Sequence, residues 1–513
     1  MIYHLLELTS LIAEYGLRPE LIRRKVRRND AVGVLFVALL NGEVQTEQDL
    51  EKVLRSAAGA VTTEAVALLK SRLKRRMLNS ILFLDLRPEK NSEQTIQYLR
   101  VQRRLAQLKV LVRLGADRNI RSEARKGYRT AREYELTAEA LEFAVMLRAY
   151  YVGIGDKGRF EHYARAVAEL LELHAAELEA DAAYRRFIIH YVKRMSYTEQ
   201  TASILQDSIA TYRRVSSSND SMLIRIVGFR LRIYDADMSA RYSDVYAIAS
   251  EALAYLSTKS KIATNSDIAE FALYQLSSCV YTRDVENGIV ASAAATSYFP
   301  AGTFNWFVAK EQSVLFFLHI QHYEAARTAL SDASRNASFK LLPEIQQQRW
   351  HVYELFLLFA TGELRNMLSR RTKRSVALHE LMALSSQIRG DRAGFGFSVR
   401  LIYILYLIEK GSFDELTESI ESFRIFVSRY MKPSVYPRSN SFAKLIVLAE
   451  RYSYNYLIVK TKAQKYLQRM QSVIASPTEM NENIQILPYE LIWDHVLESL
   501  RKHQRSLRTM AKP

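Results

Sequence analysis

Apolar residues recur at steps of three or four positions along most of the chain, and short polar stretches interrupt them. The clearest case lies mid-chain, where the apolar run Val314–Leu318 leads into the polar stretch Gln321–Glu324. Beyond it, Ala325, Ala329 and Ala333 lie four residues apart. Side chains at this spacing share one face of a helix, and small ones let a neighbouring helix approach closely. The pattern predicts a helix, a tight turn and a second helix.

The same turn, followed by an aromatic residue or a leucine, recurs along the chain. The residues that mark it are Phe160 (with its turn placed at Lys157-Gly158), Tyr242, Tyr323, Leu364 and Phe413. The gaps between them are 82, 81, 41 and 49 residues, and each of the first two is about twice 41. Polar stretches at Tyr197–Glu199 and Asp284–Gly288 lie where the two intervening turns are expected. Periods of roughly 20 to 50 residues are typical of solenoids, so we predict a helical-hairpin repeat of about 41 residues.

The two ends of the chain lie outside this rhythm. The apolar run Val32–Leu40 ends at Asn41-Gly42, Thr62–Glu64 has the residues of a helix start, and another helix is expected from Ser92 to Leu114. Pro488 is expected to open a last helix that caps the stack. We therefore predict an N-terminal basic helical region at 1–114, repeats at 115–470, and a capping helix with a basic tail at 471–513.

The amino-acid composition favours helices along the whole chain. Among 513 residues there are only 17 glycines and 9 prolines, and no run of alternating strands with hairpin turns appears. The predicted fold class is all-α, a helical-hairpin repeat solenoid preceded by an N-terminal helical region.

The single cysteine, Cys279, excludes a disulfide framework and a cysteine-based zinc site. The N-terminus lacks the basic start of a signal peptide. The most apolar runs, at 34–40 and 401–408, are under half the roughly 20 residues that span a bilayer. We expect a cytoplasmic protein without a membrane span.

Positive charge is concentrated near the N-terminus. The formal net charge is +17, and residues 51–132 hold 20 Lys or Arg against 7 Asp or Glu. The candidate partner-binding residues are the cations of two predicted helices: Lys70, Arg72, Lys74, Arg75, Arg76, Arg103 and Arg104. Three interpretations remain open: a solvated helix face, contacts with nucleic-acid phosphates, or contacts with an acidic protein surface.

The sequence holds no recognisable catalytic, metal or cofactor motif. His319 and His322 have the three-residue spacing of helical metal ligands, but their place beside a turn predicts exposed polar residues. Gly390, Gly394 and Gly396 lie among arginines, but the Gly-Lys-Ser/Thr end of a phosphate loop is missing. We predict no catalytic residue, no metal and no cofactor.

The hairpins resemble tetratricopeptide repeats from about Gly115 to Met470. The resemblance is carried by Gly158–Tyr163, His322–Ala326 and Gly411–Leu416, where a small or polar turn residue precedes an aromatic and then a second helix. The repeats of that family have 34 residues, against about 41 here. The resemblance implies a concave surface that binds a protein or a peptide, and it implies no chemistry.

Three functional hypotheses follow. The first is a non-enzymatic scaffold or adaptor that binds a protein or peptide partner in its concave surface. The second is binding of nucleic acid or a ribonucleoprotein through the basic N-terminal helices. The third is an enzyme with an unfamiliar site, which a buried cluster of titratable side chains would support. The sequence predicts no oligomeric state.

Overall fold

The computed structural model describes residues 2–14, 31–58, 62–84, 92–115, 119–194, 199–364, 366, 393–473, 475–476, 478–479 and 482–510. Within these ranges every regular element is a helix, which confirms the predicted all-α class. The chain divides into two compact units, and the division falls inside helix α8 (Lys157–Arg194). Unit 1 comprises Met1–His174 with Lys261–Thr264, and unit 2 comprises Ala175–Ser260 with Asn265–Pro513. The boundaries at 114 and 470, which delimit the expected repeats, stay predictions.

Unit 1 contains two clusters of helices. The first cluster consists of α1 (Ile2–Glu14), α2 (Ala31–Leu40), α3 (Glu47–Ala58) and α4 (Thr63–Ser80). The second consists of α5 (Glu93–Arg113), α6 (Ile120–Glu133), α7 (Thr137–Gly153) and the first part of α8. The helix signals read from the sequence are confirmed here. Thr62 and Ser92 cap α4 and α5 through their hydroxyl oxygens, and Gly42 takes the left-handed conformation after α2.

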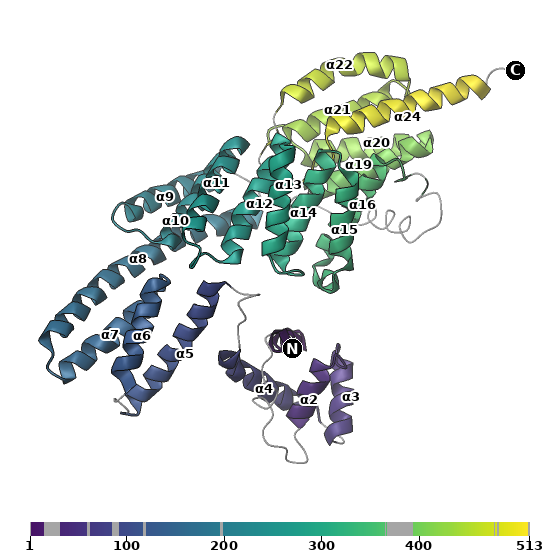
Figure 1. Ribbon diagram of the computed structural model, residues 1–513. Coiled ribbons are helices and arrows are strands. Elements are labelled where there is room, and N and C mark those ends of the chain that lie inside the picture. Colours follow the sequence, from purple (N-terminus) through teal and green to yellow (C-terminus); the bar gives the residue numbers. More distant parts are fainter. Residues whose placement is uncertain are drawn as a thin grey trace. The chain divides into compact units, whose positions relative to one another are not determined.

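Unit 2 continues from the second part of α8 through a series of helices, each packed against the next (Figure 1). These are α9 (Glu199–Ser216), α10 (Met222–Met238), α11 (Tyr242–Thr258), α12 (Asn265–Thr282), α13 (Val285–Tyr298), α14 (Phe304–His319), α15 (Tyr323–Arg335), α16 (Glu344–Ala360), α19 (Ala393–Lys410), α20 (Phe413–Tyr430), α21 (Pro437–Arg451), α22 (Tyr456–Ser472) and α24 (Tyr489–Met510). Helix α12 also contacts α14, α14 contacts α16, and α16 contacts α19. One apolar core runs through α12 to α24.

Tight turns of one geometry join the pairs. Ala240, Gln321, Gly362 and Gly411 all have a positive φ, from 52° to 77°. In each case the next residue donates its backbone N–H to the carbonyl five positions earlier, as His322 does to Phe317 over 2.8 Å. This double signature is the Schellman motif, which satisfies the last carbonyls of the first helix. We call α10, α12, α14, α16, α19 and α21 first helices. Helices α12 and α21 are also followed by residues with a positive φ, Arg283 and Ser453.

Most of the turns expected from the sequence are confirmed, and one is misplaced. Tyr242, Tyr323 and Phe413 are each the first residue of a helix, and so is Val285 of α13. The expected turn near Thr198 lies outside the described residues. The turn placed at Lys157-Gly158 was wrong by two residues: Gly155 takes the positive φ, because the carboxylate of Asp156 already caps α8 by accepting from the N–H of Arg159.

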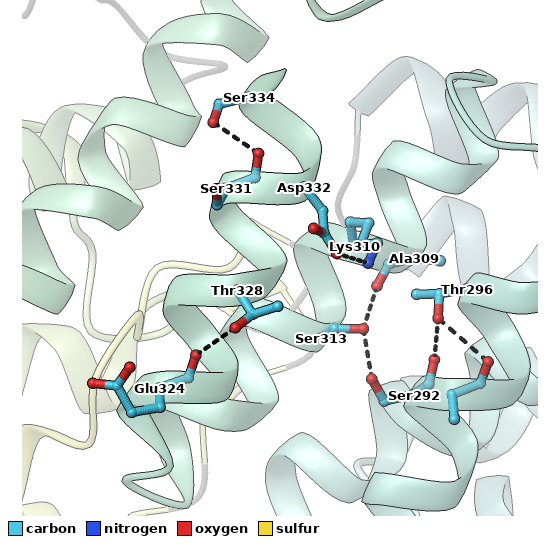
Figure 2. A network of polar contacts seen from close by, with 11 residues as sticks. Ser292, Thr296, Ala309, Lys310, Ser313, Glu324, Thr328, Ser331, Asp332 and Ser334 are labelled. Carbon is cyan, nitrogen blue, oxygen red and sulfur yellow. Dashed lines mark hydrogen bonds and ion pairs between the residues drawn. The ribbon is translucent and has the colours of Figure 1, made fainter. Parts of the chain in front are cut away.

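Small side chains allow α13, α14 and α15 to approach closely (Figure 2). The hydroxyl of Ser292 on α13 donates to that of Ser313 on α14 over 2.8 Å, and Ser313 in turn donates to the carbonyl of Ala309. One turn earlier on α14, Lys310 pairs with Asp332 of α15 at 2.8 Å. The alanines of α15 face the core, with Ala326, Ala329 and Ala333 buried and Ala325 half-buried.

The shared turn geometry makes opposite predictions for two positions. A side chain at Gly362 meets no atom within 4 Å, so Gly362→Ala tests the positive φ alone. We expect this change to lower the free energy of unfolding of unit 2 by about 1 kcal/mol. Gln321 occupies the equivalent place of another turn, and Gln321→Gly relieves the strain of the positive φ there. We expect it to raise the free energy of unfolding by a few tenths of a kcal/mol.

The measurement is the thermal unfolding midpoint, followed by circular dichroism. Opposite shifts of the two variants support the shared geometry. An unchanged midpoint for Gly362→Ala contradicts it.

Candidate functional site

The seven candidate cations lie on two helices of unit 1 and have different surroundings. Lys70 on α4 pairs with Glu47 of α3. Arg103 on α5 donates to the carbonyl of Leu84, and the Nε of Arg104 lies 3.1 Å from the Glu123 carboxylate of α6. These three cations therefore hold neighbouring elements of unit 1 together.

The remaining four lie within five consecutive positions of α4 and are spread around the helix. Arg72 and Arg75 are exposed, and Lys74 and Arg76 are half-buried. The same helix leaves Leu68 and Leu78 about half exposed, at 51% and 47%. Arg72 and Arg75 have no carboxylate partner among the described residues. Arg72 and Arg75, which we call the basic row, are the part of the predicted basic patch that an acidic partner could reach, and their binding role stays a prediction.

In unit 2, residues 482–488 form an irregular segment that crosses several first helices. We call it the crossing segment. Its Gln485 carbonyl accepts from the ring of His319 on α14 over 2.7 Å, and its Ile484 carbonyl accepts from Ser398 on α19 over 3.3 Å. Ile484, Ile486 and Leu487 are buried. First helices thus bind a non-helical stretch of chain through its backbone and through its aliphatic side chains.

Two carboxylates anchor this stretch. Glu482 accepts from the backbone N–H of Gly394 over 2.8 Å and from the Tyr436 hydroxyl over 3.0 Å. Glu479, which lies just before the crossing segment, accepts from the backbone N–H groups of Ser439 and Ser476 over 2.7 and 2.9 Å. Burial raises the pKa of both carboxyl groups above their ordinary value. The bonded donors oppose that shift and keep the charge tolerable in the interior.

Arg438, at the start of α21, joins the ends of this region. Its Nε donates to the Gln485 side chain over 3.0 Å, and its Nη2 lies 2.5 Å from the Glu490 carboxylate of α24. A second Nη atom donates to the carbonyls of Met470 and Val473 at the end of α22. One guanidinium thereby connects α21, α22, the crossing segment and α24, which is a use suited to its fixed fork of donors.

Neighbouring first helices are also linked by polar pairs at regular spacing. Arg230 of α10 binds Glu270 of α12 through two hydrogen bonds of 2.9 and 2.5 Å, across a separation of 40 residues. Arg349 of α16 contacts Glu311 of α14, 38 residues apart, at 3.4 Å. The hydroxyls of Tyr234 and Tyr274 are 3.4 Å apart across 40 residues. Equivalent positions on successive first helices therefore face one another.

One cavity among the buried charges of unit 2 is too small for a substrate. The cavity beside Arg438, Glu479 and Asn483 has a volume of about 10 Å³, and a single water needs roughly 10 to 15 Å³. The titratable groups around it are occupied by the structural contacts above. Within the part of the chain that the structure covers, no three His, Cys, Asp or Glu side chains gather as a metal site requires.

The expectation for His319 was wrong. We expected exposed polar residues at both His319 and His322, and His322 is indeed exposed. His319 instead is 7% exposed, because the crossing segment covers the end of α14. Of the glycine cluster after α16, Gly390 lies outside the described residues. Gly394 uses its N–H to bind Glu482.

The sequence also did not predict an open cavity in unit 2. Helices α20, α21 and α22 surround an open cavity of about 520 Å³. Its walls include four cations: Arg424, Lys432, Lys444 and Arg451. The signal for it was present in the charge count, since residues 424–469 contain ten Lys or Arg and one acidic residue, Glu450.

Comparison with known proteins gives no match among family models, curated proteins or solved structures. Among the described helices, none combines the length and apolar character that crossing a membrane requires.

The buried His319 predicts a pH-dependent stability. Burial, with smaller contributions from the nearby Arg283 and Arg438, lowers the pKa of His319 from 6.5 to about 4. The neutral ring therefore stabilises the fold above pH 6.5, and this stability, roughly 3 kcal/mol, is lost as the pH falls from 6.5 towards 4. His319→Gln keeps an N–H donor for the Gln485 carbonyl but has no proton to gain.

The measurement is the unfolding midpoint of both proteins between pH 7 and pH 4. Protonation of Glu479 and Glu482, whose pKa values are raised, favours the fold at falling pH in both proteins, so the difference between the two curves reports on His319. We expect the wild-type midpoint to fall more steeply. Parallel curves would show that His319 does not titrate in this interval.

Proposed function

We propose that this protein is a non-enzymatic helical-repeat adaptor that binds a protein or peptide segment along its first helices. The observation that carries the proposal is the crossing segment. First helices α14 and α19 already bind a non-helical stretch of polypeptide through hydrogen bonds to its backbone, and Arg438 of α21 binds its Gln485 side chain. Ile484, Ile486 and Leu487 of this stretch are buried. A surface with these properties suits recognition of an extended peptide.

A solenoid of hairpins similar to tetratricopeptide repeats is the architecture we infer for this adaptor. Its support is the recurring Schellman turn together with the polar pairs between neighbouring first helices, 38 to 42 residues apart. Residues 115–470 as the repeat region, and a cytoplasmic location, belong to the same proposal.

Helices α8, α10 and α12 carry three tyrosines whose rings lie close together. Tyr184, Tyr234 and Tyr274 are half-buried there, and Arg230 lies 5.3 Å above the Tyr184 ring. Partly exposed tyrosines beside a paired arginine are common anchors of protein interfaces, because they bury a large area at a low entropic cost. We place the partner on this tyrosine surface.

The test compares two variants in a pull-down from cell extract. Tyr184→Ala with Tyr274→Ala removes rings from the tyrosine surface, and Tyr298→Ala removes an exposed ring from α13. We expect a partner that is retained in high salt by the wild type and by Tyr298→Ala, and lost with the double variant. Circular dichroism checks that each variant folds. Equal retention by both variants would place the interface elsewhere.

Binding of nucleic acid or a ribonucleoprotein through the basic row on α4 is the alternative. The observation that favours it is the exposure of Arg72 and Arg75 without carboxylate partners in the described chain. Such cations release counterions when they meet phosphates, which makes the affinity strongly dependent on salt.

Charge reversal tests this alternative. For Arg72→Glu with Arg75→Glu, we expect weaker retention of duplex nucleic acid and a slope of log affinity against log salt reduced by roughly two. The matched control is Lys52→Glu with Arg55→Glu, two exposed cations of α3 in the same unit. If both pairs weaken retention equally, only the net charge matters and the basic row is no site.

A further inference from the structure

The cavity between α20, α21 and α22 has an aliphatic floor. Val427 and Met431 contribute to it from the end of α20, and Ala443, Val447 and Leu448 contribute from α21. Its volume of about 520 Å³ lies within the range of sites that bind small molecules or anchoring side chains. An open, aliphatic hollow of this size favours an occupant with a large apolar group.

Positive charge surrounds this floor. Arg424 has a carboxylate partner, Glu421, at 2.7 Å. Lys432, Lys444 and Arg451 are exposed, and none has such a partner in the described part of the chain. Between 421 and 469 the sequence has ten Lys or Arg against two acidic residues, Glu421 and Glu450, so positive charge is in excess around the cavity. Such an excess attracts an anionic occupant.

Asn440 gives separate evidence for an occupant, because one of its polar atoms lacks a hydrogen-bond donor within the described chain. Its side chain lines the cavity and is 6% exposed. Its amide nitrogen donates to the Met431 carbonyl over 2.8 Å. Because a carbonyl only accepts, the nitrogen and not the oxygen of the Asn440 amide must lie next to Met431. The other end of the side chain, Oδ1, is buried and receives no hydrogen bond from the described protein. A buried acceptor left in this state costs roughly 1 to 3 kcal/mol, which an N–H donor of an occupant would recover.

We propose that this cavity binds an acidic segment of a protein partner, with one large apolar side chain on the aliphatic floor. Flanking carboxylates pair with Lys432, Lys444 and Arg451, and a backbone N–H of the segment donates to Oδ1 of Asn440. The inference rests on the proposed function in one respect, that the occupant is a protein. It assigns a second site, separate from the tyrosine surface.

The lining favours a peptide over a nucleic acid. Proteins that bind single strands stack bases on several aromatic rings. Tyr466 is the one aromatic residue in the lining of this cavity, and the rest of the floor is aliphatic. Phosphate contacts alone would leave the floor and the Asn440 acceptor unused.

The test uses the full-length chain and fluorescence anisotropy. The probe is a fluorescein-labelled dodecapeptide with a central phenylalanine flanked by glutamates and aspartates. The comparison probes are the same peptide with alanine in place of phenylalanine, and fluorescein-labelled oligothymidylate. Lys444→Glu with Arg451→Glu reverses two charges at the cavity. Arg186→Glu with Lys340→Glu, at two exposed cations away from it, makes the same change in net charge.

We expect the cavity variant to weaken binding of the phenylalanine peptide by about tenfold or more, and the control by less than about twofold. The alanine peptide should bind more weakly to the wild type. Val447→Phe, which fills the cavity and keeps every charge, should also weaken binding, so that the proposal stays testable if the charge variant fails to fold.

Equal losses in the cavity and control variants would overturn the proposal, since binding would then follow net charge. So would equal affinity for the phenylalanine and alanine peptides, or tighter binding of oligothymidylate that the cavity variant abolishes. Each of these outcomes leaves the tyrosine surface untouched. Conversely, peptide binding at the cavity with no effect of Tyr184→Ala and Tyr274→Ala on partner capture would remove only the first-helix proposal.

Discussion

The arrangement of unit 2 depends on the fact that no helix in its centre can bury its apolar surface alone. Helix α16 shows this most clearly, because its second half, from Leu355 to Ala360, is buried on every side. A helix that is apolar all round must be enclosed by other helices. Its neighbours α14, α15 and α19 supply that enclosure. Helix α16 is therefore stable only among its neighbours, a dependence that stacked helical repeats share.

Close stacking leaves backbone and charged groups in the interior, and the chain satisfies them locally. At the turns, the left-handed residue and the following N–H bind the last carbonyls of the first helix. Along the crossing segment, Glu479 and Glu482 accept from backbone N–H groups, and Arg438 binds carbonyls and carboxylates of several elements. Because the hydrogen-bonding groups of these side chains already have partners within the fold, their role is structural. Asn440 differs from them, because one end of its amide is left without a donor.

The cations of the chain fall into two groups, those bound to a neighbouring element and those left exposed to a partner. Lys70, Arg103 and Arg104 come from the most basic stretch, yet each binds an adjacent element of unit 1. Around the cavity of α20 to α22, by contrast, Lys and Arg outnumber acidic residues, and exposed cations without a carboxylate partner remain among the described residues. A count of charges therefore locates a positive field, and the surroundings of each cation decide which of them a partner could reach.

The amino-acid sequence by itself determined the all-α class, most helix ends and the tight turns, because these depend on residues close together in the chain. Thr62 and Ser92 bind N–H groups three residues on, and Gly362 and Gly411 adopt a conformation that glycine tolerates. Only the tertiary structure decided the surroundings of His319 and Asn440. Their burial depends on contacts between distant segments, with 166 residues separating His319 from Gln485, and no local pattern encodes such a distance. For the same reason, the candidate cations were recognisable in sequence, whereas their division into structural and accessible ones was not.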